Sequence, residues 1–252
     1  MIYITGDTHA EFNRFNTTNF PEQKEMTKDD YVIICGDFGG IWDTPEESGA
    51  EKHWLKWLKE RPFTLLFVDG NHENHERLAE YPVREWHGGK VHEIRPSVLH
   101  LMRGQVFEID GKIFFTFGGA SSHDISGGIL EPDDPEFRKK KKQLDREGVS
   151  YRINHVSWWK EELPSEEEMQ EGLDNLKKND NTVDYIVTHC CSTDTQIALG
   201  GKLLYQPDIA TEYLEKIKEI ADYKKWFFGH YHQNINVNDK EILIYEQIIR
   251  IA

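Results

Sequence analysis

The chain has few cysteines, no long apolar run and no excess of positive charge. Its three cysteines, Cys35, Cys190 and Cys191, occur among 252 residues without CxxC spacing, so neither a disulfide framework nor a structural zinc knuckle is expected. No apolar run approaches the length of a membrane span, and the first residues lack the basic and apolar regions of a signal peptide. These absences predict a protein of the reducing cytoplasm that has no membrane partner.

The formal net charge is -15, so the surface as a whole should repel polyanions. Stable binding of nucleic acid is therefore not expected. The exception is the basic run Arg138-Lys139-Lys140-Lys141-Lys142, for which a solvated face or a mobile loop is the favoured interpretation. The sequence contains no heptad pattern from which an oligomeric state could be inferred.

What the sequence does contain is a series of short apolar runs, each followed closely by metal-binding side chains. Runs rich in β-branched and aromatic residues predict buried strands, and ligands bind outside the carboxyl ends of strands in open α/β sheets. Loops that follow several such strands can therefore meet at one site. The runs and the side chains that follow them are residues 2–5 with Asp7 and His9, 31–35 with Asp37, 64–69 with Asn71, 184–188 with His189, and 226–228 with His230 and His232.

The segments between these runs predict an α/β fold. Helical spacing is found over residues 45–60, 72–81, 165–178 and 208–222, where Ser165 and Glu168 form a capping box. Residues 97–102, 105–109 and 112–117 are β-like, and Asp110-Gly111 predicts a hairpin between the last two. We expect a single domain over residues 1–252, with a lid-like insertion at about 125–160 where periodicity fades.

Carboxylates, imidazoles and an amide oxygen are the ligand types that divalent metals need for phosphate chemistry. Two metals that lie close together can share one carboxylate and clamp the oxygens of a phosphoryl group. Asp37 stands alone after its run and is the natural candidate for the shared ligand. The seven side chains therefore predict a two-metal site.

The motifs Gly6-Asp7-Thr8-His9, Gly36-Asp37, Gly70-Asn71-His72-Glu73, His189 and Gly229-His230-Tyr231-His232 occur in this order along the chain. Together they resemble the ordered motifs of the calcineurin-like metallophosphoesterase superfamily. Looser matches at 118–124 and 158–165 are similar to its bacterial and phage members. The resemblance implies that Asp7, His9 and His232 hold one metal, that Asn71, His189 and His230 hold the other, and that Asp37 bridges both.

The same resemblance implies a fold, a catalyst and a reaction. The fold would be a β-sandwich of two mixed sheets flanked by helices, in place of one doubly covered sheet. His72 would lie beside the leaving group as the catalytic residue. Two divalent ions, Mn, Fe or Zn, would hold a bridging hydroxide that hydrolyses a phosphomonoester or phosphodiester. A small phosphodiester or a nucleotide is the favoured substrate.

The chain departs from the protein-phosphatase pattern after Asp37, because Phe38-Gly39-Gly40 replaces the usual acidic residue and arginine. Asp124 is the candidate to orient His72. The candidates to contact the substrate phosphate are Arg77, Arg103 and Arg152, although an ordinary structural ion pair at the surface or in the core is favoured for each of them. Trp158 and Trp159 either stack on a base or, as we favour, anchor the insertion. A catalytically silent scaffold of the same fold is the alternative, and a protein phosphatase or a nuclease is the alternative within the enzyme class.

Overall fold

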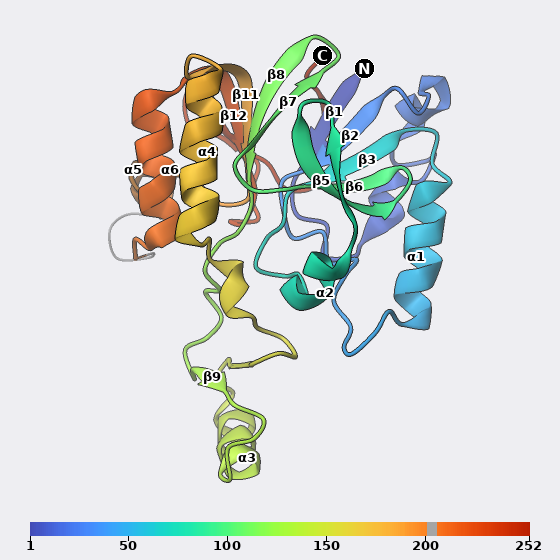
Figure 1. The fold of residues 1–252 in the computed structure, drawn as a ribbon. Helices are drawn as coiled ribbons and strands as arrows, with labels where there is room; N and C mark the ends of the chain where they lie inside the picture. Colours follow the sequence, from blue (N-terminus) through green and yellow to red (C-terminus); the bar gives the residue numbers. More distant parts are fainter. Residues whose placement is uncertain (201–205) are drawn as a thin grey trace.

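The computed structural model describes residues 1–200 and 206–252. Two mixed β-sheets pack face to face, and helices cover the outer face of each (Figure 1). The fold is therefore the β-sandwich of two mixed sheets flanked by helices, and the expectation of a single sheet covered on both faces by helices was wrong. None of the helices in the described ranges is long and apolar enough to cross a membrane.

The first sheet has seven strands among the described residues, in the order β15-β1-β2-β3-β6-β5-β4. Strands β1, β2, β3 and β6 are parallel to one another, so their carboxyl ends share one edge. Its strands are β1 (Ile2–Thr5), β2 (Tyr31–Ile34), β3 (Thr64–Phe67), β4 (Val83–Trp86), β5 (Gly89–Arg95), β6 (Val98–Leu101) and β15 (Ile249–Arg250).

The second sheet has six strands in the described part of the chain, in the order β13-β14-β12-β11-β8-β7. Strands β8, β11, β12 and β14 are parallel. The predicted hairpin joins β7 to β8, with positive φ at both Asp110 (51°) and Gly111 (69°), as tight hairpin turns require. Its strands are β7 (Gln105–Ile109), β8 (Lys112–Phe117), β11 (Thr182–Thr188), β12 (Asp222–Phe228), β13 (Ile235–Asn236) and β14 (Glu241–Leu243).

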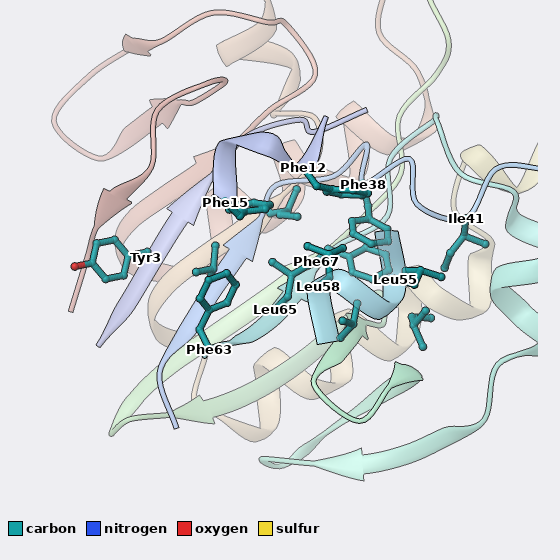
Figure 2. Packing of buried hydrophobic residues seen from close by; sticks show 14 of the residues in the cluster. Tyr3, Phe12, Phe15, Phe38, Ile41, Leu55, Leu58, Phe63, Leu65 and Phe67 are labelled. Atoms are coloured by element: carbon teal, nitrogen blue, oxygen red, sulfur yellow. The ribbon is translucent and has the colours of Figure 1, made fainter. Parts of the chain in front are cut away.

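Buried side chains form three clusters that separate the four layers. One lies between the two sheets and takes Ile2 and Ile4 from β1. Another packs β2 and β3 against Leu55 and Leu58 of helix α1 (Gly49–Lys59), with Phe38 stacked on Phe67 at 4.3 Å between ring centroids (Figure 2). The third packs the outer face of the second sheet against helices α4 (Glu166–Lys178) and α6 (Ile209–Ile220). Central strands thus bury both faces, which is why their sequences are continuously apolar.

The predicted helices occur with shifted ends because their caps lie inside the expected ranges. The 45–60 helix begins only after Ser48, and the 72–81 helix only after Asn74, whose side chains accept backbone N–H groups at the helix start. The 165–178 and 208–222 helices start directly after their N-cap residues, Ser165 and Asp208, each of which forms a capping box with the third residue of its helix. The helices are α1 (Gly49–Lys59), α2 (His75–Glu80), α3 (Phe137–Glu147), α4 (Glu166–Lys178), α5 (Thr193–Gly200) and α6 (Ile209–Ile220), with 3₁₀ turns at Phe12–Phe15, Pro21–Glu25 and Lys160–Glu162.

The segment between β8 and α4 extends away from the sheets (Figure 1). It holds α3 and a small parallel pair, β9 (Ile129–Leu130) and β10 (Arg152–Ile153). The basic run 138–142, expected as a solvated face or a mobile loop, lies on α3, which has no buried residue anywhere along its described length. It is a solvated helical face, which was one of the two interpretations expected for this run.

Candidate metal centre

The polar side chains that follow the apolar runs meet at the edge where parallel strands of both sheets end. Asp7 follows β1, Asp37 follows β2 and Asn71 follows β3, all in the first sheet. His189 follows β11, and His230 and His232 follow β12, all in the second sheet. The sandwich therefore places residues that are more than two hundred positions apart in the chain within hydrogen-bond reach of one another.

One group of side chains forms around Asp7. Ligand atoms of Asp7, His9, Asp37 and His232 all lie within 4.8 Å of one another. The Nε2 atoms of His9 and His232 are 2.9 Å apart, and Nε2 of His232 is 3.1 Å from Oδ2 of Asp7. His232 is about half exposed, so this group is open to solvent on one side.

A second, buried group forms around His189. Its Nε2 lies 3.2 Å from Oδ1 of Asn71 and 3.3 Å from Oδ1 of Asp37. Its Nδ1 lies 2.9 Å from the backbone oxygen of Cys35, a contact that orients the ring and directs Nε2 to Asn71 and Asp37. The His230 ring packs against that of His189 at 4.9 Å between centroids.

Asp37 lies between the two groups, with one carboxylate oxygen toward each. Its Oδ1 is the atom 3.3 Å from His189, whereas its Oδ2 lies 3.6 Å from Nε2 of His9. The backbone N–H of His72 donates to Oδ1 at 2.8 Å and orients the carboxylate. A carboxylate placed in this way can coordinate two cations at once.

The backbone around the site adopts conformations that most residues avoid. His9, Asp37, His230 and His232 have positive φ angles of 44°, 46°, 69° and 49°. Each such conformation costs free energy, and it persists only where surrounding contacts impose it. At this site, hydrogen bonds from the backbone to the carboxylates help to impose these conformations. For example, the N–H of His230 donates to both carboxylate oxygens of Asp7, at 2.9 and 3.0 Å.

The electrostatics of the site favour a cation near Asp37. Burial alone would raise the pKa of the Asp37 carboxyl, but the charge of His189 and its hydrogen bond hold that pKa well below its usual range. Burial likewise opposes protonation of His189, yet Asp37 raises the pKa of His189 to about 10. The carboxylates at this edge thus stabilise positive charge among nitrogen and oxygen donors, as a divalent metal site requires.

His72 lies beside these groups without joining either of them. Its ring makes an edge-on contact with His9 at 4.7 Å between centroids and stacks on Trp42 at 5.5 Å. Nη2 of Arg152 lies 3.0 Å from its Nε2. Burial, opposed by Asp37 and reinforced by Arg152, lowers the pKa of His72 to about 4, and the guanidinium N–H of Arg152 donates to Nε2.

The candidate residues around His72 have different surroundings. Asp124 pairs with Arg152, with Oδ2 2.6 Å from Nη2, and Arg152 rather than Asp124 contacts His72. Arg77 is buried, and its Nη1 lies 2.8 Å from Oε2 of Glu51. Arg103 is also buried and forms ion pairs with Asp69 and Glu168. Both arginines therefore make the structural ion pairs that were favoured for them. Trp159 is buried and contacts Trp42, which fits the expectation that it anchors the insertion.

Three features of the site were absent from the sequence interpretation. Nε2 of His123 lies 3.3 Å from Nε2 of His230. Ser122 lies 3.4 Å from the amide of Asn71 and donates to the carboxylate of Glu162 at 2.6 Å. Glu73 accepts the N–H groups of Phe38 and Gly39 at 2.7 and 3.0 Å and shapes the loop after Asp37. Only the position of His123 in a loop after an expected strand could have identified it.

The family of the chain follows from comparison with known proteins. A family model described as calcineurin-like phosphoesterase matches residues 1–234. The chain therefore belongs to the calcineurin-like phosphoesterases, and the resemblance inferred from its motifs is confirmed.

Individual relatives match parts of the chain. The lariat debranching enzyme A of Xenopus laevis is 27% identical over 143 residues, which are 52% of this chain and 26% of that protein. The lariat debranching enzyme of Danio rerio is 25% identical over 150 residues, 54% of this chain and 25% of that protein. The chain thus spans about a quarter of the length of these curated relatives.

Among solved structures, the phosphopantetheinyl hydrolase of Mycobacterium tuberculosis aligns with 97% of this chain and 87% of its own, at 13% identity and a TM-score of 0.43. We draw no argument from a similarity this distant.

Proposed function

We propose that this protein hydrolyses a phosphodiester or phosphomonoester with two divalent metals, and that its substrate is a small phosphodiester or a nucleotide. The observation that carries the proposal is the position of Asp37, which directs Oδ2 to His9 and Oδ1 to His189. A carboxylate shared between two donor groups is the arrangement that two-metal hydrolysis requires.

We assign the proposed ligands to the two metals according to the two groups of side chains in the site. Asp7, His9 and His232 would hold one metal, Asn71, His189 and His230 the other, with Asp37 common to both. Imidazoles mixed with hard oxygens favour Mn, Fe or Zn over Mg. When bound, the metals would activate a water molecule and neutralise charge on the phosphoryl oxygens.

The remaining steps would fall to the protein's own side chains. Arg152 carries a fixed positive charge at the edge of the site, 3.0 Å from His72, and would bind a phosphate oxygen. His72 would lie at the leaving oxygen and stabilise its charge or donate a proton. Trp42, stacked on His72, would hold the imidazole in place.

The relatives add support for a diester. Those with matching segments are named as lariat debranching enzymes, which favours phosphodiesters over phosphoproteins as substrates. The net charge of -15 favours a small substrate over a long polyanion. A silent scaffold is disfavoured because the seven proposed ligands and His72 are all present.

Hydrolysis of bis-p-nitrophenyl phosphate tests the proposal. We expect turnover that a chelator removes and added Mn²⁺ restores, and we expect Asp37→Asn to lose most of it. An Asp37→Asn protein with wild-type activity would show that the assignment is wrong, and no turnover with any divalent metal would favour the scaffold.

The His72→Ala variant separates chemistry from metal binding. General acid catalysis contributes about 10²–10⁴-fold, so we expect kcat to fall within that range while the metal content by elemental analysis stays at the wild-type level. Loss of metal from this variant would make His72 a ligand.

A further inference from the structure

A pocket of about 340 Å³ opens directly beside His72 and His9. This volume is at the lower end of the range for small-molecule pockets, about 300–1,000 Å³, and suits a single ring system. The pocket lies between the turn that follows β1, the loop that follows β2 and the first turns of α1. The residues that line it include Phe12, Gly40, Trp42, Asp43, Glu51 and Trp54.

Aromatic rings form much of the wall of this pocket. Trp42 is held in place on two sides, by stacking on His72 at 5.5 Å and by an edge contact with Trp159 at 5.7 Å between centroids. Trp54 of α1 packs edge-on against buried Phe12 at 5.8 Å. Both indoles are only half-buried, so each has ring surface available to a ligand.

The polar side chains that line the pocket are the carboxylates of Asp43 and Glu51 and the imidazoles of His9 and His72. Glu51 is already engaged, since it accepts the N–H groups of Trp42 and Asp43 at 2.5 and 2.8 Å and pairs with Arg77. Among residues 1–200 and 206–252, Asp43 makes its hydrogen bonds through its backbone N–H and backbone oxygen, and none through its carboxylate. A ligand here would meet aromatic faces and a carboxylate that accepts hydrogen bonds, and negative charge would be repelled.

We propose that this pocket binds the group that leaves during hydrolysis, and that this group carries an uncharged nucleobase with an amino substituent. The inference rests on the proposed function, because His72 marks the side of the phosphate from which the leaving group departs. One P–O bond breaks, the oxygen of water forms the new bond, and the leaving oxygen takes up a proton. The base would stack on Trp54 and donate its amino N–H to Asp43.

Binding of free nucleosides tests the pocket without requiring turnover. Loss of one base–aromatic stack weakens binding by about tenfold, so by calorimetry we expect adenosine to bind the wild-type protein about tenfold more tightly than Trp54→Ala. Trp57→Ala is the matched control, since Trp57 lies on α1 and contacts Trp54 but does not line the pocket. Trp54→Phe should restore much of the affinity and so separates stacking from folding.

Asp43 is tested by comparing adenosine with purine riboside, which lacks the amino group. Asp43→Ala should lower the affinity for adenosine to that for purine riboside and leave purine riboside unchanged. Adenosine binding that is equal in wild type and Trp54→Ala, or methyl riboside binding as well as adenosine, would overturn the pocket assignment.

The calorimetric result is independent of the hydrolysis assay. A protein that hydrolyses bis-p-nitrophenyl phosphate while Trp54→Ala binds adenosine normally would contradict only the pocket. A protein that shows the expected binding pattern without hydrolysis under any metal would support the pocket and contradict the catalytic proposal.

Discussion

Gly70 lies against the proposed bridging carboxylate. A Cβ at Gly70 would fall 2.1 Å from Oδ1 of Asp37 and 2.8 Å from Nε2 of His189. Gly70→Ala must therefore displace Asp37 or His189. Since disturbing the groups that orient ligands costs about 10–100-fold in metal affinity, we expect at least that loss in a metal titration.

The control for this substitution is Gly49→Ala, because a Cβ at Gly49 meets nothing within 4 Å. It should bind metal and turn over substrate as the wild type does. Wild-type metal affinity in Gly70→Ala would show that the carboxylate does not bridge in this geometry.

Of the three candidate arginines, Arg152 is the one that contacts His72, and its loss should affect substrate hydrolysis more than stability. Its partner Asp124 is half exposed, so that ion pair contributes little to folding. A hydrogen bond to a charged group is worth about 1.5–3 kcal/mol, so Arg152→Leu should lower kcat/KM about 10–100-fold with metal content and Tm nearly unchanged. Unaltered kcat/KM would remove Arg152 from the substrate site.

At the residue scale, the sequence indicated which side chains meet but not what surrounds them. Order and residue type were sufficient to select Asp7, Asp37 and His189, because each follows a strand that ends at the same edge. The contacts of Arg152 and Trp42 with His72 depend on where the projecting segment packs. No local pattern encodes that packing, so Arg152 was one of three candidate arginines.

At the scale of elements, one buried ion pair connects α1, α2 and the loop that carries Trp42. Arg77 of α2 donates to Glu51 of α1 and to the backbone oxygen of Asp43 at 2.7 Å. Removal of one partner of a buried pair costs about 3–5 kcal/mol, so Arg77→Leu should lower the free energy of unfolding in urea by that amount.

Lys56→Ala is the matched control on α1, since its pair with Glu60 spans 4.0 Å and both side chains are largely exposed. Its loss should change stability by less than about 1 kcal/mol. An Arg77→Leu protein as stable as this control would contradict the role assigned to the buried pair.

Local chemistry accounts for the elements that were predicted and for those that were missed. The capping box at Ser165 and the Asp110-Gly111 turn act over a few residues and were visible in the sequence. Helix α3 was missed because it buries nothing and therefore shows no apolar stripe. Helix ends shifted at Ser48 and Asn74 because a cap, rather than the first apolar residue, sets where a helix begins.

At the scale of the whole molecule, the sequence alone did not reveal that the strands divide between two sheets. A continuously apolar strand indicates that both of its faces are covered, but not whether a helix or another sheet covers them. The resemblance to a family supplied the sandwich, and the buried cluster between the sheets is where that prediction is confirmed.

Global stability should depend on pH through His75, a histidine buried outside the metal site. Burial lowers the pKa of His75 to about 4, so the unfolded chain binds a proton between about pH 6.5 and 4 that the folded chain does not. The stabilising effect of neutral His75 is therefore present above pH 6.5 and is lost as the pH falls. The loss of stability reaches about 3 kcal/mol near pH 4.

We expect the metal-free protein to lose Tm steeply between pH 6.5 and 4 and His75→Leu to lose it less steeply. Thermal melts of both proteins across this range, with a chelator present, measure the difference. Parallel pH profiles would show that His75 is not the group responsible.

We propose that Asp37 is shared by two metals at the edge where both sheets end. Elemental analysis of Mn²⁺-loaded protein after gel filtration measures how many ions the site holds, with Gly49→Ala as the folded control. We expect two metal ions per chain in the wild type and the control, and at most one in Asp37→Asn. Two ions retained by Asp37→Asn, or one ion in the wild type, would rule out a shared carboxylate.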